Sequence, residues 1–180
     1  MPSFTRTGAA NRIYVMALDL QKKAMDLRVI IGWVSSFAAP EDITFRSAIY
    51  VQIGRGLSFD DTLNNSVLQG IPTIQLVPGT EAVEVVSTLA GSEQISQFVL
   101  PAPVRLNGHR NRYFLAITSP SANAEWATPG LLGAANEVLA TTETFGTSWP
   151  QTLQRTAQVA GLTRIPVFQL LSEEGAVHLV

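Results

Sequence analysis

Acidic side chains suited to general acid–base catalysis occur in one predicted loop. Asp60 and Asp61 lie within residues 54–66, whose Gly, Asp and Asn content predicts a loop. Two carboxylates on either side of a glycosidic bond can hydrolyse it, and carboxylate oxygens also bind calcium. Acidic residues are equally ordinary turn formers, and we favour that interpretation. A small hydrolase with Asp60 or Asp61 as its acid or base is the least favoured of three functional hypotheses.

Other catalytic signatures are absent from the sequence. It contains no G-x-S-x-G nucleophile elbow, no H-E-x-x-H zinc motif and no Walker-type glycine loop. The absence of cysteine excludes thiolate metal ligands, and the two histidines lie in an apparent turn, His109, and near the C-terminus, His178. We therefore predict no catalytic residue, no cofactor and no metal site, and we expect the chain not to be an enzyme.

Basic side chains gather around a predicted Asn-Gly turn at positions 107–108. Arg105, His109, Arg110 and Arg112 flank this turn, and arginine pairs well with carboxylates and phosphates. The cluster is a candidate contact with an acidic neighbour, although it also suits a turn that is merely kept soluble. The net charge is −2 and only two of the twelve basic residues are lysines, so nucleic acid is not an expected partner.

Aromatic side chains provide the second hypothesis, a carbohydrate-binding module. Trp126, Trp149 or Tyr113 could stack on a sugar ring, and an exposed indole could also insert into a protein partner. Burial of Trp126 and Trp149 at the end of a sandwich fits the sequence equally well. Trp33 lies within a predicted strand and is expected in the core.

Short apolar runs bounded by turn residues predict an all-β fold, an antiparallel β-sandwich or barrel. We expect strands at residues 12–20, 26–37, 44–53, 71–77, 82–89, 95–100 and 165–171. A helix is the rival interpretation for residues 17–31, where Leu20, Ala24, Leu27 and Ile31 have helical spacing.

Residues 97–120 are the clearest architectural signal, because two apolar β segments are joined there by the Asn-Gly turn. The C-terminal third is less regular. Residues 131–140 predict a short helix, and Ser148 could cap a second one with Pro150 in its first turn. Both a helix and a strand fit residues 152–160.

Length and termini suggest one domain preceded by an arm. Residues 1–11 are polar and small apart from Phe4, which predicts an extended N-terminal arm that grips a neighbouring subunit. Residues 12–180 are long enough to form a single β-sandwich domain without disulfides. The chain has no run of 18 apolar residues and no apolar signal core, so we expect a soluble, unprocessed protein with no membrane partner.

The order of residues within the stretch 97–120 resembles an edge of jelly-roll β-sandwich modules. In these modules a strand ending in a proline-valine step is followed by a glycine turn and a tyrosine-led strand. The matching residues are Phe98, Pro101, Pro103, Val104, Leu106, Gly108, Tyr113, Leu115, Ile117 and Ser119. Such modules are found in carbohydrate-binding domains and in virion proteins of tailed phages. The resemblance implies a jelly-roll-like fold and assigns no binding residue.

This sequence departs from the sugar-binding pattern, because it lacks a run of aromatic residues with acid and amide residues around them. The first hypothesis is therefore a non-enzymatic virion protein, a capsid decoration, cement or tail component assembled in the host cytoplasm. It is expected to form homo-oligomers and to bind other virion proteins through its arm and loops. The candidate contact residues are Phe4, Arg6, Arg105, Arg110, Arg112, Trp126 and Trp149.

Overall fold

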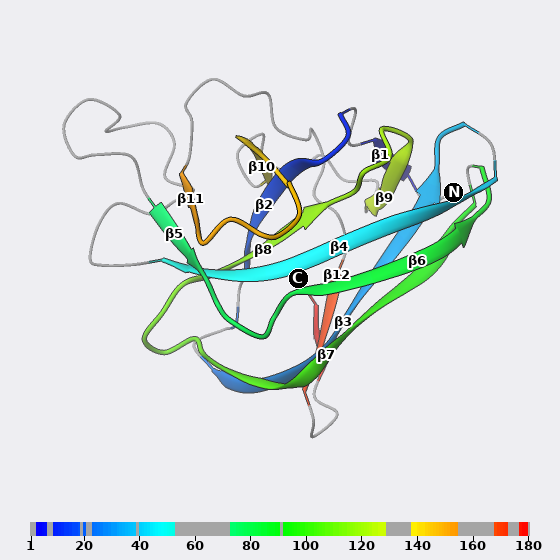
Figure 1. The fold of residues 1–180 in the computed structure, drawn as a ribbon. Coiled ribbons are helices and arrows are strands. Elements are labelled where there is room, and N and C mark those ends of the chain that lie inside the picture. Colours follow the sequence, from blue (N-terminus) through cyan, green and yellow to red (C-terminus); the bar gives the residue numbers. More distant parts are fainter. Residues whose placement is uncertain are drawn as a thin grey trace.

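The chain folds into two β-sheets that face each other across a shared core (Figure 1). The computed structural model describes residues 3–6, 9–18, 20, 23–38, 40–52, 73–90, 92–128, 138–154, 168–172 and 177–179. In this part of the chain the regular elements are all strands, and every ladder between two of them is antiparallel. The predicted all-β antiparallel sandwich is thus confirmed, whereas jelly-roll connectivity stays a prediction.

The first sheet, sheet A, is organised around one long strand, β3. Its path runs β1-β9-β3-β12-β13, and β7 pairs with the other edge of β3. Its strands are β1 (Ser3–Arg6), β3 (Ala24–Ser36), β7 (Gln94–Asn107), β9 (Ala124–Thr128), β12 (Phe168–Ser172) and β13 (Val177–Leu179).

The second sheet, sheet B, is organised around β4. Its path runs β10-β2-β8-β4-β5-β11, and β6 pairs with β4 next to β5. Its strands are β2 (Arg12–Leu18), β4 (Glu41–Gln52), β5 (Thr73–Leu76), β6 (Ala82–Thr88), β8 (Tyr113–Thr118), β10 (Val138–Thr144) and β11 (Thr152–Gln154).

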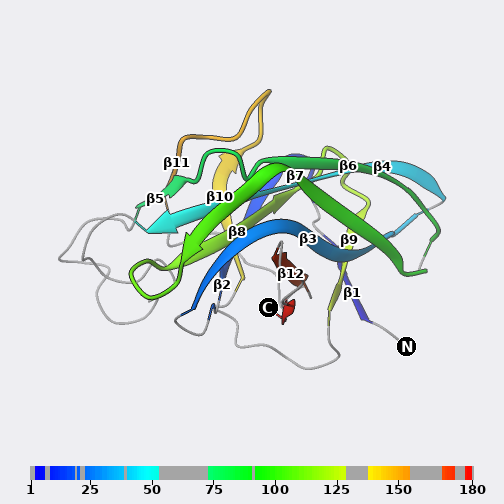
Figure 2. The same cartoon turned by 90° about the horizontal axis from the view of Figure 1, so that it is seen from below.

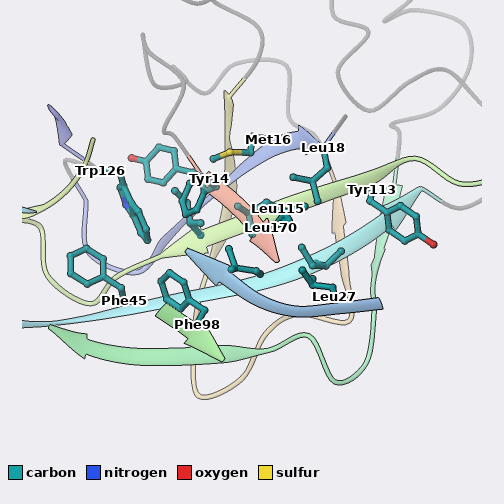
Figure 3. Packing of buried hydrophobic residues seen from close by; sticks show 14 of the residues in the cluster. Tyr14, Met16, Leu18, Leu27, Phe45, Phe98, Tyr113, Leu115, Trp126 and Leu170 are labelled. Atoms are coloured by element: carbon teal, nitrogen blue, oxygen red, sulfur yellow. The ribbon is translucent and has the colours of Figure 1, made fainter. Parts of the chain in front are cut away.

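Successive side chains of each strand point alternately into and away from the space between the sheets, and the inward ones form the core. In β4, Ile43, Phe45 and Ile49 point into the space between the sheets, whereas Arg46 and Tyr50 belong to the outer face. This period of two is the pattern expected of a pleated strand. The inner side chains of both sheets meet in one apolar cluster around Trp126, Phe45 and Phe98 (Figure 3).

A second apolar cluster lies on the outer face of sheet B. Tyr50 and Phe114 from β4 and β8 are covered there by Trp149, which precedes β11, and by Leu153 within it. Strand β8 is consequently buried on both faces, and all six of its residues are buried. Sheet B is therefore covered on both faces along β8.

The strand interpretation of residues 17–31 is confirmed, because β3 occupies much of that range. Both short helices are wrong where the structure describes them. Residues 138–140, the end of the first expected helix, belong to β10 and pair with β2, and residues 131–137 lie outside the described part. The segment after Pro150 forms β11 and pairs with β5. Pairing with a distant strand has overridden a weak local helix preference in both places.

The N-terminal segment is extended over residues 3–6, but it does not project from the molecule there. It forms β1, which pairs with β9 in the register Phe4↔Ala127 and Arg6↔Glu125. These residues therefore contribute an edge strand to sheet A of their own chain.

The Asn-Gly turn joins β7 in sheet A to β8 in sheet B, so it passes between the two layers (Figure 2). The amide of Gly108 donates a hydrogen bond to the carbonyl oxygen of Lys23 at 2.8 Å. A Cβ at this position would lie 2.6 Å from the same oxygen, so the close approach requires glycine. The two predicted segments and their turn are confirmed, and the turn closes one end of the sandwich.

Candidate functional site

Apolar side chains cover the outward surface of three neighbouring strands, β3, β6 and β7. Along β7, Ile95 and Val99 point away from the core and are 56% and 54% exposed. Their register partners on β3 are Trp33 and Val29, which are only half-buried. We call the following set the apolar outer surface: Val29, Ile31, Trp33, Val83, Val85, Ile95 and Val99.

Strand β6 carries the apolar outer surface from sheet A onto sheet B. Val83 and Val85 are each 62% exposed and lie opposite Arg46 and Thr44 on the outer face of β4. Strands β6 and β7 run side by side in both ribbon views (Figures 1 and 2). Exposed aliphatic side chains on adjacent strands are typical of a surface that contacts another protein.

The carboxylate of Glu84 links β6 to β7 by hydrogen bonds. Glu84 points inward from β6, opposite Phe45, and accepts a hydrogen bond from Ser96 Oγ at 3.0 Å. The same carboxylate oxygen also accepts a hydrogen bond from the backbone amide of Gln97. Because this edge of β7 is occupied by a charged side chain, it is poorly suited to pairing with a strand from another molecule.

Strand β7 also bulges beside Arg28. The pairing passes from Val29↔Val99 to Leu27↔Val104, so residues 100–103 have no one-to-one partners on β3. Arg28 donates a hydrogen bond to the carbonyl oxygen of Leu100 at 2.8 Å and thereby stabilises the bulge. Pro101 and Pro103 lie within it, where a missing amide proton costs no ladder hydrogen bond.

A cleft of about 610 Å³ opens beside this surface, between residues 145–151 and the strands β4, β5 and β6. Arg46 and Phe145 line it, and the guanidinium carbon of Arg46 lies 4.6 Å from the centre of the Phe145 ring. Trp149 packs edge-on against Phe145 and Tyr50, with ring-centre distances of 5.2 and 6.3 Å. Val83 belongs both to the cleft wall and to the apolar outer surface.

Tyr50 does not line the cleft, but it packs against Trp149, which does, and holds the loop that forms this wall. Its hydroxyl donates a hydrogen bond to the carbonyl oxygen of Pro150 at 2.7 Å. Burial raises the pKa of Tyr50 above the ordinary value of 10.0, and the negative charges of Glu143 and Glu81 raise it further. The hydroxyl is therefore neutral at physiological pH and acts as a donor.

Stability is expected to decline above pH 10.0, the ordinary tyrosine pKa, and Tyr50 contributes to that decline. Because folding raises the pKa of Tyr50, its stabilising contribution is complete below the unfolded pKa and is lost as the pH rises toward the folded pKa. One tyrosine contributes at most about 1.4 kcal/mol per pH unit. Urea unfolding at about pH 8 and about pH 11 should show a smaller decline for Tyr50→Phe than for the wild type.

Tyr14 provides a reference for this measurement, because burial also raises its pKa while the charge of Arg12 and a hydrogen bond to Arg12 lower it. A Tyr14→Phe variant should therefore retain the Tyr50 component of the decline. Equal declines in the wild type and in Tyr50→Phe would contradict the role of Tyr50.

The predicted arginine cluster is exposed at the turn between β7 and β8. Arg105 forms an ion pair with Asp26 at 2.6 Å, and the two side chains are 62% and 40% exposed. The exposed residues of this turn also include His109, Arg110 and Arg112. The structure thus places the three arginines at one end of the sandwich, and such exposed pairs add little to stability.

Of the two interpretations that the sequence leaves open for Trp126 and Trp149, the structure shows burial. Trp126 is fully buried between the sheets, and Trp149 is 6% exposed. Tyr113 is buried as well, and its hydroxyl accepts a hydrogen bond from the amide of Asn107 at 3.0 Å. None of these rings is therefore an exposed stacking platform, although the edge of Trp149 forms part of the cleft wall. Trp33 shows the reverse, since it lies on the outer face although it was expected in the core.

Of the other predicted site residues, some lie in described strands and others lie outside the described part of the chain. Phe4 and Arg6 belong to the edge strand β1, and His178 lies in β13 opposite Leu170. Asp60 and Asp61 lie outside the described residues. Within the described part of the chain, no group of three or more His, Cys, Asp or Glu side chains could hold a metal ion. No helix in that part has the length and apolar character needed to cross a membrane.

Sequence reasoning missed both the apolar outer surface and the cleft. The alternation of Val83, Glu84 and Val85 identifies a strand, but it does not tell which face of the strand is covered. Comparison of the chain with protein-family models, with curated proteins and with solved structures gave no match.

Proposed function

We propose that this chain is a non-enzymatic structural subunit of a virion, a capsid decoration, cement or tail component, that assembles with copies of itself. The observation that supports this proposal best is the apolar outer surface on β3, β6 and β7. Four exposed aliphatic side chains beside a half-buried tryptophan form an apolar surface that is unfavourable in water for an isolated subunit. Burial against a second copy removes it from water at roughly 25 cal/mol per Å².

The form of the surface favours contact between sheet faces over addition of a strand. Glu84 occupies the seam beside β7, and Pro101 and Pro103 interrupt the same strand at its bulge. Both features oppose edge-to-edge pairing, whereas Ile95, Val99 and Trp33 leave the face apolar. A two-fold arrangement in which this face packs on itself buries the same residues on both subunits.

The virion setting is supported by the resemblance of residues 97–120 to jelly-roll modules of tailed-phage particles. In this protein that stretch forms β7, β8 and the turn that joins the two sheets. The exposed arginines Arg105, Arg110 and Arg112 at this turn, at one end of the sandwich, are suited to an acidic surface on another virion protein.

Charges introduced into the apolar outer surface are expected to break the assembly. Val85→Lys and Ile95→Lys each place an ammonium group in the middle of the proposed contact, so association should weaken by at least about tenfold. Native mass spectrometry and light scattering over a concentration series measure the change. Each substituted side chain is already more than half exposed, so the subunit itself should keep its stability within about 0.5 kcal/mol.

Ser87→Lys is the matched control, because Ser87 lies on the outer face of β6 two positions from Val85 and is polar. It adds the same charge to the same strand beside Asp42 and should leave the oligomer intact. A wild-type chain that is strictly monomeric, and that also fails to bind particles lacking it, would contradict the proposed function.

A further inference from the structure

The cleft beside β6 is preorganised by hydrogen bonds at both ends of its loop wall. The amide of Phe145 donates to the carbonyl oxygen of Asn11 at 2.7 Å, and the carbonyl oxygen of Gln151 accepts from the amide of Leu76 at 2.9 Å. Between them the carbonyl oxygen of Pro150 accepts the hydroxyl of Tyr50. The walls therefore hold their positions without a ligand, as in most small-molecule sites.

Arg46 brings a positive charge and an unpaired N–H donor into this cleft. Its Nη1 atom is buried and has no hydrogen-bond partner. Glu81 lines the same cleft, but the two residues form no salt bridge among the described interactions. The contact of the guanidinium with the Phe145 ring offsets only part of the cost of burying a cation. The arrangement therefore lacks an acceptor within hydrogen-bond distance of Nη1, and an anionic ligand would supply one.

A carboxylate matches the guanidinium better than a diffuse anion does. The guanidinium is planar and presents paired N–H groups that fit the two oxygens of a carboxylate. Stacking on Phe145 and the packing of Phe145 against Trp149 restrict the orientation of that plane. Less conformational freedom is therefore lost when the ligand binds.

The other residues that line the cleft favour a ligand that carries hydroxyl groups in addition to its carboxylate. Glu81, Ser148 and Gln151 provide a carboxylate, a hydroxyl and an amide around the cleft, while Trp149 and Val83 provide apolar wall. A sugar ring has hydroxyl groups along its rim and apolar C–H groups on its faces, so it satisfies both kinds of wall. A volume of about 610 Å³ lies within the usual range of ligand pockets.

We infer that this cleft binds a carboxylate-bearing sugar, of the uronic acid type, with its carboxylate on Arg46 and its hydroxyls on Glu81 and Gln151. This site is distinct from the stacking platform expected from the sequence, because Trp149 contributes only a wall and Trp126 is buried elsewhere. The cleft shares Val83 with the apolar outer surface, but its polar contacts come from Arg46, Glu81 and the loop 145–151 rather than from the face of β3 and β7.

Titration calorimetry of the full-length chain with glucuronate tests the inference, with glucose and acetate as matched probes. Glucuronate should bind at least about tenfold more tightly than either, because glucose lacks the charge and acetate lacks the ring. Arg46→Gln should weaken glucuronate binding by about tenfold or more, and Arg46→Lys should restore only part of it, since an ammonium group lacks the planar pair of donors.

Ser148→Trp is a second variant that avoids the partly buried Arg46. Ser148 is exposed at the cleft, so the larger side chain should block glucuronate without disturbing the core. Ile95→Lys should leave glucuronate binding unchanged, which separates this site from the proposed assembly surface. The inference is overturned if glucuronate does not bind, if glucose or acetate binds as tightly, or if Arg46→Gln has no effect in a folded protein.

Discussion

Replacing Trp126 with alanine is expected to lower the free energy of unfolding by about 3–5 kcal/mol. Trp126 is fully buried, and its ring centre lies 5.0 Å from that of Phe45, 5.4 Å from that of Phe168 and 6.3 Å from that of Phe98. These side chains come from four strands, β9, β4, β12 and β7, so the indole joins both sheets (Figure 3). Its removal leaves a cavity that the two layers can fill only in part.

Urea unfolding followed by circular dichroism measures this loss. Phe37→Ala is the matched control, because Phe37 is 57% exposed and its truncation should cost no more than about 0.5 kcal/mol. Trp126→Phe should cost clearly less than Trp126→Ala. The Nε1 atom of Trp126 is buried without a hydrogen-bond partner, so phenylalanine removes an unsatisfied donor while keeping most of the apolar ring. Equal losses for Trp126→Ala and Phe37→Ala would contradict the position of the indole in the core.

Replacing Gly32 with valine is expected to destabilise the protein by about 3 kcal/mol, at the upper end of the range for overpacking. A Cβ at Gly32 would lie 2.8 Å from Cε1 of Phe168 and 3.5 Å from Cζ3 of Trp126. Both rings are fully buried, so neither can move aside without disturbing its neighbours. Glycine is required here by the close approach of the Phe168 ring, while Trp126 lies at ordinary van der Waals distance.

A double-mutant cycle with Phe168→Leu tests whether the clash with the Phe168 ring causes the loss of stability. Leucine lacks the ring edge that a new Cβ would meet, so Gly32→Val should cost at least about 0.5 kcal/mol less in the Phe168→Leu background than in the wild type. Strict additivity of the two substitutions would show that the cost arises from another source, such as the conformation of β3. Equilibrium unfolding of the four chains supplies all the required free energies.

The fold class could be predicted because its signals are local. Alternation in β4 and the turn residues at 107–108 depend only on nearby residues, and both appear in the structure as predicted. The two short helices failed because residues 138–140 and 152–154 pair with β2 and β5, which are distant in the sequence. A weak local preference is decided by such pairing, and pairing partners are not encoded within a short window.

The candidate site was beyond sequence reasoning for the same reason. Arg46 is one polar position within the strand expected at residues 44–53, and nothing near it in the sequence indicates Phe145 as its neighbour. The two residues meet because the loop after β10 is held against β4 by the hydrogen bond between Tyr50 and Pro150. The apolar outer surface likewise requires the register of β3 with β7, which places Trp33 beside Ile95.

By itself the sequence determined that this protein consists of antiparallel strands and where most of these strands lie. It also determined that the turn at 107–108 separates two of them. Both could be predicted because strand alternation and turn chemistry are properties of adjacent residues. Only the tertiary structure decided which face of each strand is covered. Trp126 became the centre of the core while Val85 and Ile95 remained in contact with water, since burial depends on which strands and loops pack against each face. Those contacts join residues far apart in the chain and exist only once the sheets have assembled.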